Sequence, residues 1–229
     1  MDEELNIKYL EDFVLSNPDL DRLENLLSEF NIFETLNLAN AEIRHSNFLA
    51  WMLDPNGNHG LGNYFIKQFL KQIASSNKSY FSSTNISLFD FELFSYTNVE
   101  VRREWNAIDV FIIINENNKK VAVAIENKIK TLEHSNQLQR YREFVEKEFN
   151  RFDHLIFVYL TPENLIPSDD AWITFNYEVI SELLGELILY KKSILNPNVY
   201  SFISQYLTIL RRHVVGNSEV EKIANLQHA

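Results

Sequence analysis

The spacing of apolar positions predicts helices in the first third of the chain. Residues 8–30 carry apolar side chains about 3.6 residues apart and are interrupted by an Asn-Pro pair, which predicts two short helices. A longer helix is predicted over residues 35–53, where the same spacing continues until the breaker cluster Asp-Pro-Asn-Gly. A further helix is predicted over residues 61–75.

The pattern changes to one typical of strands near residue 86. Short β-type runs are predicted at 89–96 and 99–105, and two strongly apolar runs follow at 108–114 and 121–125. The polar stretch between the apolar runs favours a hairpin. The remaining predicted elements are a helix over 133–149, a buried strand over 155–160 and helices over 178–193 and 198–213. This order predicts a single mixed α/β domain over residues 1–229.

A turn centred between residues 117 and 118 would fix the register of the hairpin. Asp109 then lies opposite Glu126, one sheet face carries matched β-branched pairs, and the other carries large side chains against small ones. The matched pairs are Val110–Ile125, Ile112–Val123 and Ile114–Val121 on one face, with Phe111–Ala124 and Ile113–Ala122 on the other. Because both faces are apolar, the hairpin is expected at the centre of the sheet, between layers of helices.

The two carboxylates at the end of this hairpin predict a cation site. Directly opposed residues have Cβ atoms roughly 4.5–5.5 Å apart, so Asp109 and Glu126 would raise each other's pKa. Hard oxygen ligands at this spacing suit Mg²⁺. Lys128 emerges on the same face as Glu126, where its ammonium can position a nucleophile or stabilise charge on phosphorus. The pattern is equally consistent with an ordinary hairpin whose charged ends reach solvent.

Composition narrows the class of protein. The chain has 229 residues, 45% of them apolar and 13% aromatic, which suffices for one well-packed domain. It contains no cysteine, which excludes disulfides, zinc ribbons and thiol nucleophiles. The acidic start is unlike a signal peptide, and no apolar run approaches the ~18–20 residues of a membrane span. A cytoplasmic protein without a membrane partner is expected.

The net charge of −11 counts against tight non-specific binding of nucleic acid. A cation site contributes carboxylates of its own, so the charge does not exclude an enzyme that acts on phosphodiesters. Nucleic acid would have to meet a local basic patch. The candidate patches are Arg102-Arg103, Lys119-Lys120, Arg140 with Arg142, and Arg211-Arg212.

Asp109 and the triplet Glu126-Asn127-Lys128 resemble the motif of the PD-(D/E)XK nuclease superfamily, in which an aspartate opens the second core strand and Glu-x-Lys closes the third. Ile108 stands where a proline usually precedes the aspartate. Other stretches are similar to a prokaryotic branch of largely uncharacterised members, and the resemblance spans residues 34–160. These stretches are residues 41–55, 59–62 and 125–129, followed by Glu133 and 137–141.

The resemblance implies a restriction-endonuclease-like αβββαβ core, with a mixed central sheet flanked by helices and with additional N- and C-terminal helices, the latter over 178–213. It implies a metal held by Asp109, Glu126 and the backbone carbonyl of Asn127, with Mg²⁺ expected and Mn²⁺ as a substitute. Glu42 would add a catalytic acidic group, although an exposed helix carboxylate is the alternative. The residues that would line the substrate side are Gln137 and Tyr141. Tyr141 is equally consistent with a plain packing role.

Three functions follow as hypotheses. The first is a metal-dependent nuclease, acting on DNA rather than RNA in defence or repair. The second is a catalytically inactive nuclease-fold module that binds nucleic acid or a protein partner. The third is a toxin-like or regulatory subunit of a larger system, in which a partner supplies the basic surface. A homodimer is compatible with cutting both strands.

Other chemistry is disfavoured. A Ser/His hydrolase would need a nucleophile elbow, which the sequence lacks. His45 and Ser46 are expected to pack or hydrogen-bond near Glu42, and His59 is expected to shape its loop. The tryptophans are expected in the core: Trp51, Trp105 and Trp172.

Overall fold

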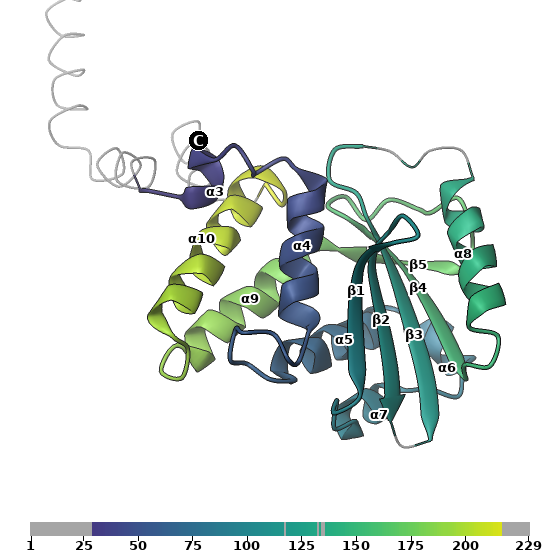
Figure 1. Cartoon of the computed structure of the whole chain (residues 1–229). Helices are drawn as coiled ribbons and strands as arrows, with labels where there is room; N and C mark the ends of the chain where they lie inside the picture. Colours follow the sequence, from purple (N-terminus) through teal and green to yellow (C-terminus); the bar gives the residue numbers. More distant parts are fainter. Residues whose placement is uncertain (1–28, 117, 132, 134–135, 217–229) are drawn as a thin grey trace, which may run out of the picture.

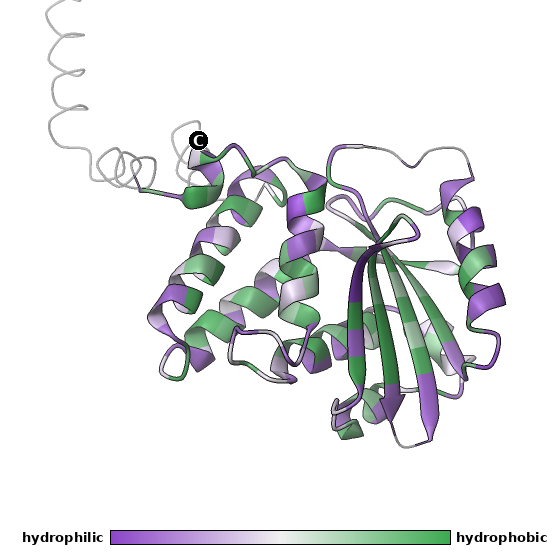
Figure 2. Ribbon diagram, in the orientation of Figure 1, coloured by the Kyte–Doolittle hydropathy of each residue, from purple (hydrophilic) through white to green (hydrophobic). Residues whose placement is uncertain are grey.

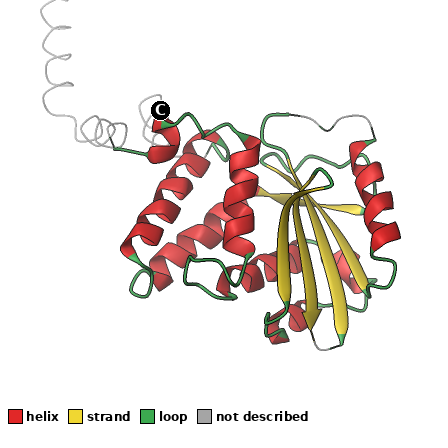
Figure 3. Ribbon diagram, in the orientation of Figure 1, coloured by secondary structure: helices red, strands yellow, loops and turns green. Residues whose placement is uncertain are grey.

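The computed structural model describes residues 29–116, 118–131, 133 and 136–216. Within these residues, five strands form one sheet with helices on both faces (Figures 1 and 3). The elements are, in chain order, α3 (Ile32–Thr35), α4 (Glu42–Leu53), α5 (Tyr64–Ser76), α6 (Lys78–Ser82), α7 (Leu88–Leu93), β1 (Val99–Trp105), β2 (Ile108–Glu116), β3 (Lys119–Asn127), α8 (Gln137–Glu148), β4 (His154–Thr161), β5 (Trp172–Asn176), α9 (Tyr177–Lys191) and α10 (Pro197–His213).

The sheet is mixed, with the strand order β1-β2-β3-β4-β5. Strands β1, β2 and β3 run antiparallel, whereas β3–β4 and β4–β5 are parallel pairs. Asn118 in the β2–β3 turn has a φ of 62°, a left-handed conformation that asparagine tolerates. A parallel pair needs a crossover connection, and α8 provides it between β3 and β4. This arrangement is the α/β sandwich that the sequence predicts.

The hairpin register predicted from volume matching is confirmed. Val110 pairs with Ile125 and Phe111 with Ala124, and the pairing continues in step to the turn. The matched β-branched pairs of β2 and β3 belong to the large core beneath α4, α5, α9 and α10. The large-against-small pairs face α8 and form a second, smaller core with Leu138 and Val145. Figure 2 shows the corresponding apolar strands between amphipathic helices.

Three predicted elements differ from the structure. The helix predicted over 35–53 is wrong at its start, since α4 begins at Glu42 and Asn37 has a positive φ of 53° in the preceding turn. The strand predicted at 89–96 is wrong, because Ser87 and Asp90 form a capping box that starts α7. The helix predicted over 133–149 begins only at Gln137. The helices predicted over 8–30 lie outside the described residues, except for residues 29 and 30.

The sequence interpretation also missed strand β5. It is five residues long and pairs with β4 at the edge of the sheet. Its Trp172 is buried, as expected for a core tryptophan, and its indole N–H donates to the carbonyl of Leu138 in α8. None of the described helices is long and apolar enough to cross a membrane.

Candidate metal and phosphodiester site

The candidate site lies at the open end of the central hairpin. The β2–β3 pairing is regular up to Val110 and Ile125. One residue further, the Asp109 carboxylate accepts a hydrogen bond from the backbone N–H of Asn127, at 2.8 Å from Oδ2. The Asp109 side chain therefore extends the hydrogen bonding between β2 and β3 by one residue beyond the last paired positions. This contact holds the carboxylate beside Glu126, as the predicted register requires.

Glu126 is buried, with 1% of its surface exposed. Its Oε1 accepts from Lys128 Nζ at 2.9 Å and from Gln137 Nε2 at 2.8 Å. Its Oε2 is also buried but has no hydrogen-bond partner among the described residues. A buried carboxylate oxygen without a donor is energetically unfavourable, so each such atom needs an explanation. A cation or a proton bound at Oε2 would satisfy this oxygen atom.

The pKa shifts of the site residues also indicate that the site lacks positive charge. Burial raises the pKa of Asp109 to about 6, although the Asn127 N–H and Lys128 act in the opposite direction. Burial and the neighbouring Asp109 raise the pKa of Glu126 to about 7. Burial alone would lower the pKa of Lys128, but the hydrogen bond and charge of Glu126 outweigh it and raise that pKa. One ammonium thus faces two desolvated carboxyl groups.

The Asn127 side chain points to the other face of the sheet. Its Nδ2 donates to Ser46 Oγ at 3.0 Å and to the Glu42 carbonyl at 3.3 Å, and its Oδ1 accepts from the Tyr177 hydroxyl at 2.6 Å. These contacts fasten the end of β3 to α4 and α9. Because the side-chain amide is used in this way, it is not available to a cation, and a role for the Asn127 backbone carbonyl as a metal ligand stays a prediction.

Glu42, the first residue of α4, anchors the segment that follows Lys128. Its Oε1 accepts from the backbone N–H groups of Ile129, Lys130 and Thr131 at 2.8–3.1 Å, and the Thr131 hydroxyl lies 3.0 Å from both carboxylate oxygens. Burial would raise the pKa of Glu42, but these hydrogen bonds outweigh it and lower that pKa. The charge of Glu42 contributes to the raised pKa of Asp109. Sequence reasoning placed Glu42 near the site but missed its contacts with this segment.

Gln137 and Tyr141 lie one turn apart at the start of α8. Gln137 Nε2 reaches both Glu126 Oε1 and the Tyr141 hydroxyl, which is 2.9 Å away. Tyr141 is half-buried and packs against the smaller core. The structure thus connects both residues to the carboxylate site. A role toward substrate stays a prediction.

The histidines and Ser46 have structural partners. His45 is buried and contacts the Tyr206 hydroxyl and the Ala39 carbonyl, each at 2.9 Å. Ser46 donates to the Glu42 carbonyl and accepts from Asn127. His59 contacts the Asp54 carbonyl and accepts from the Leu61 N–H, so it shapes its loop. These contacts match the packing roles expected from the sequence.

The donor set fits a hard divalent cation with few protein ligands. Among the described residues, no group of three or more His, Cys, Asp or Glu side chains is placed to hold a metal ion. Mg²⁺ is usually bound through one or two carboxylates, with water and substrate phosphates completing the shell. Asp109 and Glu126, with the unpartnered Oε2, supply this smaller set. Glu42 is directed instead toward the 129–131 backbone.

A mixed sheet whose central hairpin ends in two carboxylates and a lysine, with helices on both faces, defines a restriction-endonuclease-like fold. A family model described as the PD-(D/E)XK nuclease superfamily matches residues 30–228. The chain therefore belongs to the PD-(D/E)XK nuclease superfamily, and this membership supports a nuclease-type function. Nucleases of the superfamily generally use divalent metals. No curated protein and no solved structure matches the chain significantly.

Proposed function

We propose that this protein is a metal-dependent nuclease that hydrolyses phosphodiester bonds in DNA. One observation carries the proposal. Asp109, Glu126 and Lys128 meet at the buried end of the central hairpin, and Glu126 Oε2 lies there without a donor among the described residues. Two desolvated carboxyl groups with one ammonium leave the site short of positive charge. A divalent cation and a phosphodiester together complete it.

Asp109, Glu126 and the Asn127 carbonyl would hold Mg²⁺, with Mn²⁺ as a substitute. The bound cation would offset the carboxylate charges and polarise a phosphoryl oxygen. Lys128 Nζ, which is 2.9 Å from Glu126 Oε1, is the donor that can orient a water molecule or stabilise charge developing on the phosphate. An ammonium suits this role because it offers three N–H donors.

The surrounding residues are assigned supporting roles in the proposal. Glu42 adds negative charge beside the site and holds the 129–131 segment, which fixes the direction in which the chain leaves Lys128. Gln137 orients the Glu126 carboxylate through a 2.8 Å hydrogen bond. Gln137 and Tyr141 would face the substrate from α8. A pathway of defence or repair agrees with a DNA substrate.

Calorimetric titration tests the cation site directly. Mg²⁺ and Mn²⁺ are titrated into the native chain, Asp109→Ala and Glu126→Ala, with Glu182→Ala on the exposed side of α9 as the matched control. Binding is expected in the native chain and the control and is expected to be lost in both site variants. Unchanged binding in the two site variants would contradict the proposed ligand set.

A cleavage assay then tests the reaction. Supercoiled and linear DNA are incubated with Mg²⁺ and the native chain or Lys128→Ala, and a matched RNA tests the choice of nucleic acid. Removing a donor that stabilises the transition state typically lowers the rate by about 10²–10³-fold, and a loss of that size is expected for Lys128→Ala. A native chain that binds the cation and nucleic acid without cutting would instead be the inactive binding module.

A further inference from the structure

Three hydrogen bonds hold the side chain of Asn127, the middle residue of the Glu-x-Lys triplet. Asn127 is buried, with 1% of its surface exposed. Its Nδ2 lies 3.0 Å from Ser46 Oγ and 3.3 Å from the carbonyl oxygen of Glu42, and both acceptors belong to α4. Its Oδ1 accepts from the hydroxyl of Tyr177, the first residue of α9, at 2.6 Å. One amide side chain therefore joins the end of β3 to two helices that are far apart in the sequence.

The chemistry of these partners fixes the orientation of the Asn127 amide. The backbone carbonyl of Glu42 can only accept, so the Nδ2 donors must face α4. Burial raises the pKa of Tyr177 well above its ordinary value, so its hydroxyl stays protonated and can donate to Oδ1. Aspartate at this position would place a charged oxygen against an acceptor. Alanine would leave the buried Tyr177 hydroxyl without its partner, which is unfavourable.

Tyr177 is held in place by the sheet as well as by its own hydrogen bond. Asn127 pairs with Leu160 on β4, and Leu160 pairs with Phe175 on β5. Tyr177 follows Phe175 by two residues, and the side chain of Asn176 caps the helix that begins there. The hydroxyl therefore reaches β3 from a fixed support at the end of the sheet that carries the carboxylates.

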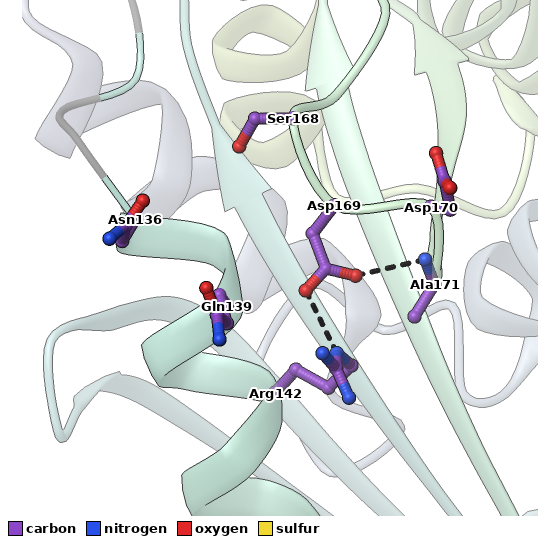
Figure 4. A pocket seen from close by; sticks show the side chains of 7 residues that line it. All are labelled: Asn136, Gln139, Arg142, Ser168, Asp169, Asp170 and Ala171. Carbon is purple, nitrogen blue, oxygen red and sulfur yellow. Dashed lines mark hydrogen bonds and ion pairs between the residues drawn. The ribbon is translucent and has the colours of Figure 1, made fainter.

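The loop that leads into β5 is also fastened to the rest of the domain (Figure 4). Arg142 Nε on α8 donates to Asp169 Oδ2 at 2.8 Å, and the Ala171 N–H donates to Asp169 Oδ1 at 2.9 Å. The indole N–H of Trp172 then donates to the Leu138 carbonyl at 3.1 Å. These contacts fix the start of β5, the strand that directly precedes α9.

The hydrogen bonds of the Asn127 side chain determine where its two neighbours in the chain point. Successive side chains of a strand lie on opposite faces, so holding Asn127 against α4 and α9 directs Glu126 and Lys128 to the other face. On that face, Lys128 Nζ lies 2.9 Å from Glu126 Oε1. The backbone N–H of Asn127 donates to Asp109 Oδ2 at 2.8 Å. A rotation of the strand end that released the amide would therefore also move Glu126 and Lys128 relative to Asp109.

We propose that Tyr177 and Ser46 are positioning residues of the nuclease site and that they act through the side chain of Asn127. They keep the end of β3 in the orientation in which Glu126 and Lys128 can meet a divalent cation and a phosphate. This positioning role rests on the proposed nuclease function and adds to it the residues that set the cation affinity. Groups that orient metal ligands without touching the metal typically change metal affinity or activity by about 10–100-fold.

Two buried tyrosines allow positioning to be separated from stability. Tyr177 and Tyr206 are both buried, and the Tyr206 hydroxyl is bonded to His45 Nδ1 at 2.9 Å. Tyr177→Phe and Tyr206→Phe each remove one buried hydroxyl, so both should lower the urea midpoint of unfolding. Of the two, only Tyr177→Phe removes a partner of Asn127. Ser46→Ala removes another partner of the same amide from α4.

The test is a calorimetric titration of Mg²⁺ into the native chain and the three variants, each first shown to be folded by circular dichroism. The Kd for Mg²⁺ is expected to rise about tenfold in Tyr177→Phe and Ser46→Ala and to change less than about twofold in Tyr206→Phe. In EDTA, hydrogen exchange at the Asn127 amide should be faster in the first two variants only. Its N–H is then held less firmly against Asp109.

Each outcome of the titration supports or overturns the positioning role. If the native chain binds Mg²⁺ and the variants bind it equally well, the positioning role is overturned and the nuclease proposal stands. Equal weakening in Tyr206→Phe would also overturn it, because the effect would then be a general loosening of the core. If Tyr177→Phe does not fold, Ser46→Ala decides by the same criterion. A native chain that binds no divalent cation overturns both proposals.

Discussion

At the scale of single residues, the carboxyl group of Glu126 is buried and that of Asp109 is half-buried. Burial raises the pKa of Asp109 from 3.8 to about 6 and, with the charge of Asp109, raises the pKa of Glu126 from 4.5 to about 7. Both groups thus keep their protons in the folded state at pH values where the unfolded chain has lost them. By linkage, their contribution to the free energy of unfolding falls as pH rises through this range.

This linkage predicts how the free energy of unfolding of the metal-free protein changes between pH 4.5 and 7.5. Urea unfolding in EDTA should show the native chain losing stability with rising pH relative to Asp109→Asn/Glu126→Gln, since each unit of raised pKa corresponds to about 1.4 kcal/mol. Mg²⁺ should then stabilise the native chain at pH 7.5 more than at pH 5.5, and should not stabilise the double variant. Parallel pH profiles for the two proteins would contradict this account.

Glu42 provides a second prediction at this scale. Because its carboxylate accepts three backbone N–H groups and a hydroxyl, Glu42→Ala should lower the free energy of unfolding by about 1–3 kcal/mol. The contribution of Glu42 is present above its ordinary pKa and is lost as pH falls through its lowered value.

Urea unfolding at pH 7 measures the effect of Glu42→Ala, and hydrogen exchange at 129–131 localises it. Glu182→Ala on α9 should change neither measurement. Slow exchange of the three amides in the Glu42→Ala variant would show that the anchor is unimportant.

The residues that sequence reasoning located are those whose positions follow from strand geometry. Asp109, Glu126 and Lys128 were found because a strand alternates its side chains and because matched volumes fix the hairpin register. Thr131 and Tyr177 were missed. Their contacts depend on where α4 and α9 dock, which periodicity along the chain does not determine. For the same reason, the sequence predicted a role only for the backbone carbonyl of Asn127 and missed the contacts of its side chain with α4 and α9.

At the scale of elements, α4 and α10 are joined by a buried polar contact. His45 lies between the Tyr206 hydroxyl and the Ala39 carbonyl, and burial lowers the pKa of His45. Tyr206→Phe leaves His45 Nδ1 buried without its partner, so the free energy of unfolding should fall by about 1–3 kcal/mol. Urea unfolding at pH 7.5 measures this change. Tyr190→Phe, at an exposed tyrosine of α9, should be neutral within about 0.5 kcal/mol.

Element prediction succeeded where two independent patterns agreed. The β2–β3 hairpin combined two continuous apolar runs with volume matching across the strands, and its register is confirmed. Helix α7 was taken for a strand because its run is short and aromatic, although the Ser87 and Asp90 capping box was a readable start signal. Strand β5 escaped notice because five residues at a sheet edge give little periodicity to detect.

At the scale of the whole molecule, the net charge of −11 restricts how nucleic acid can approach. An acidic surface repels phosphates except where basic side chains lie locally. Arg103 on β1 is exposed, pairs across the strand with Val110, and donates to Asn47 on α4 at 2.6 Å. It therefore lies beside the strand end that carries Asp109. Its position suits a contact with a substrate phosphate entering the site.

Because few basic side chains lie near the site, we expect the affinity for DNA to depend only weakly on salt concentration. With about two or three phosphate contacts, the logarithm of the binding constant for single-stranded DNA should fall with the logarithm of salt concentration at about −0.7 per contact. Arg103→Ala should reduce the magnitude of this slope by the share of one contact. Arg151→Ala, an exposed arginine just before β4 at the opposite strand end, should leave it unchanged. Equal slopes for the native chain and Arg103→Ala would place the phosphates elsewhere, because an arginine that touches no phosphate releases no counterion.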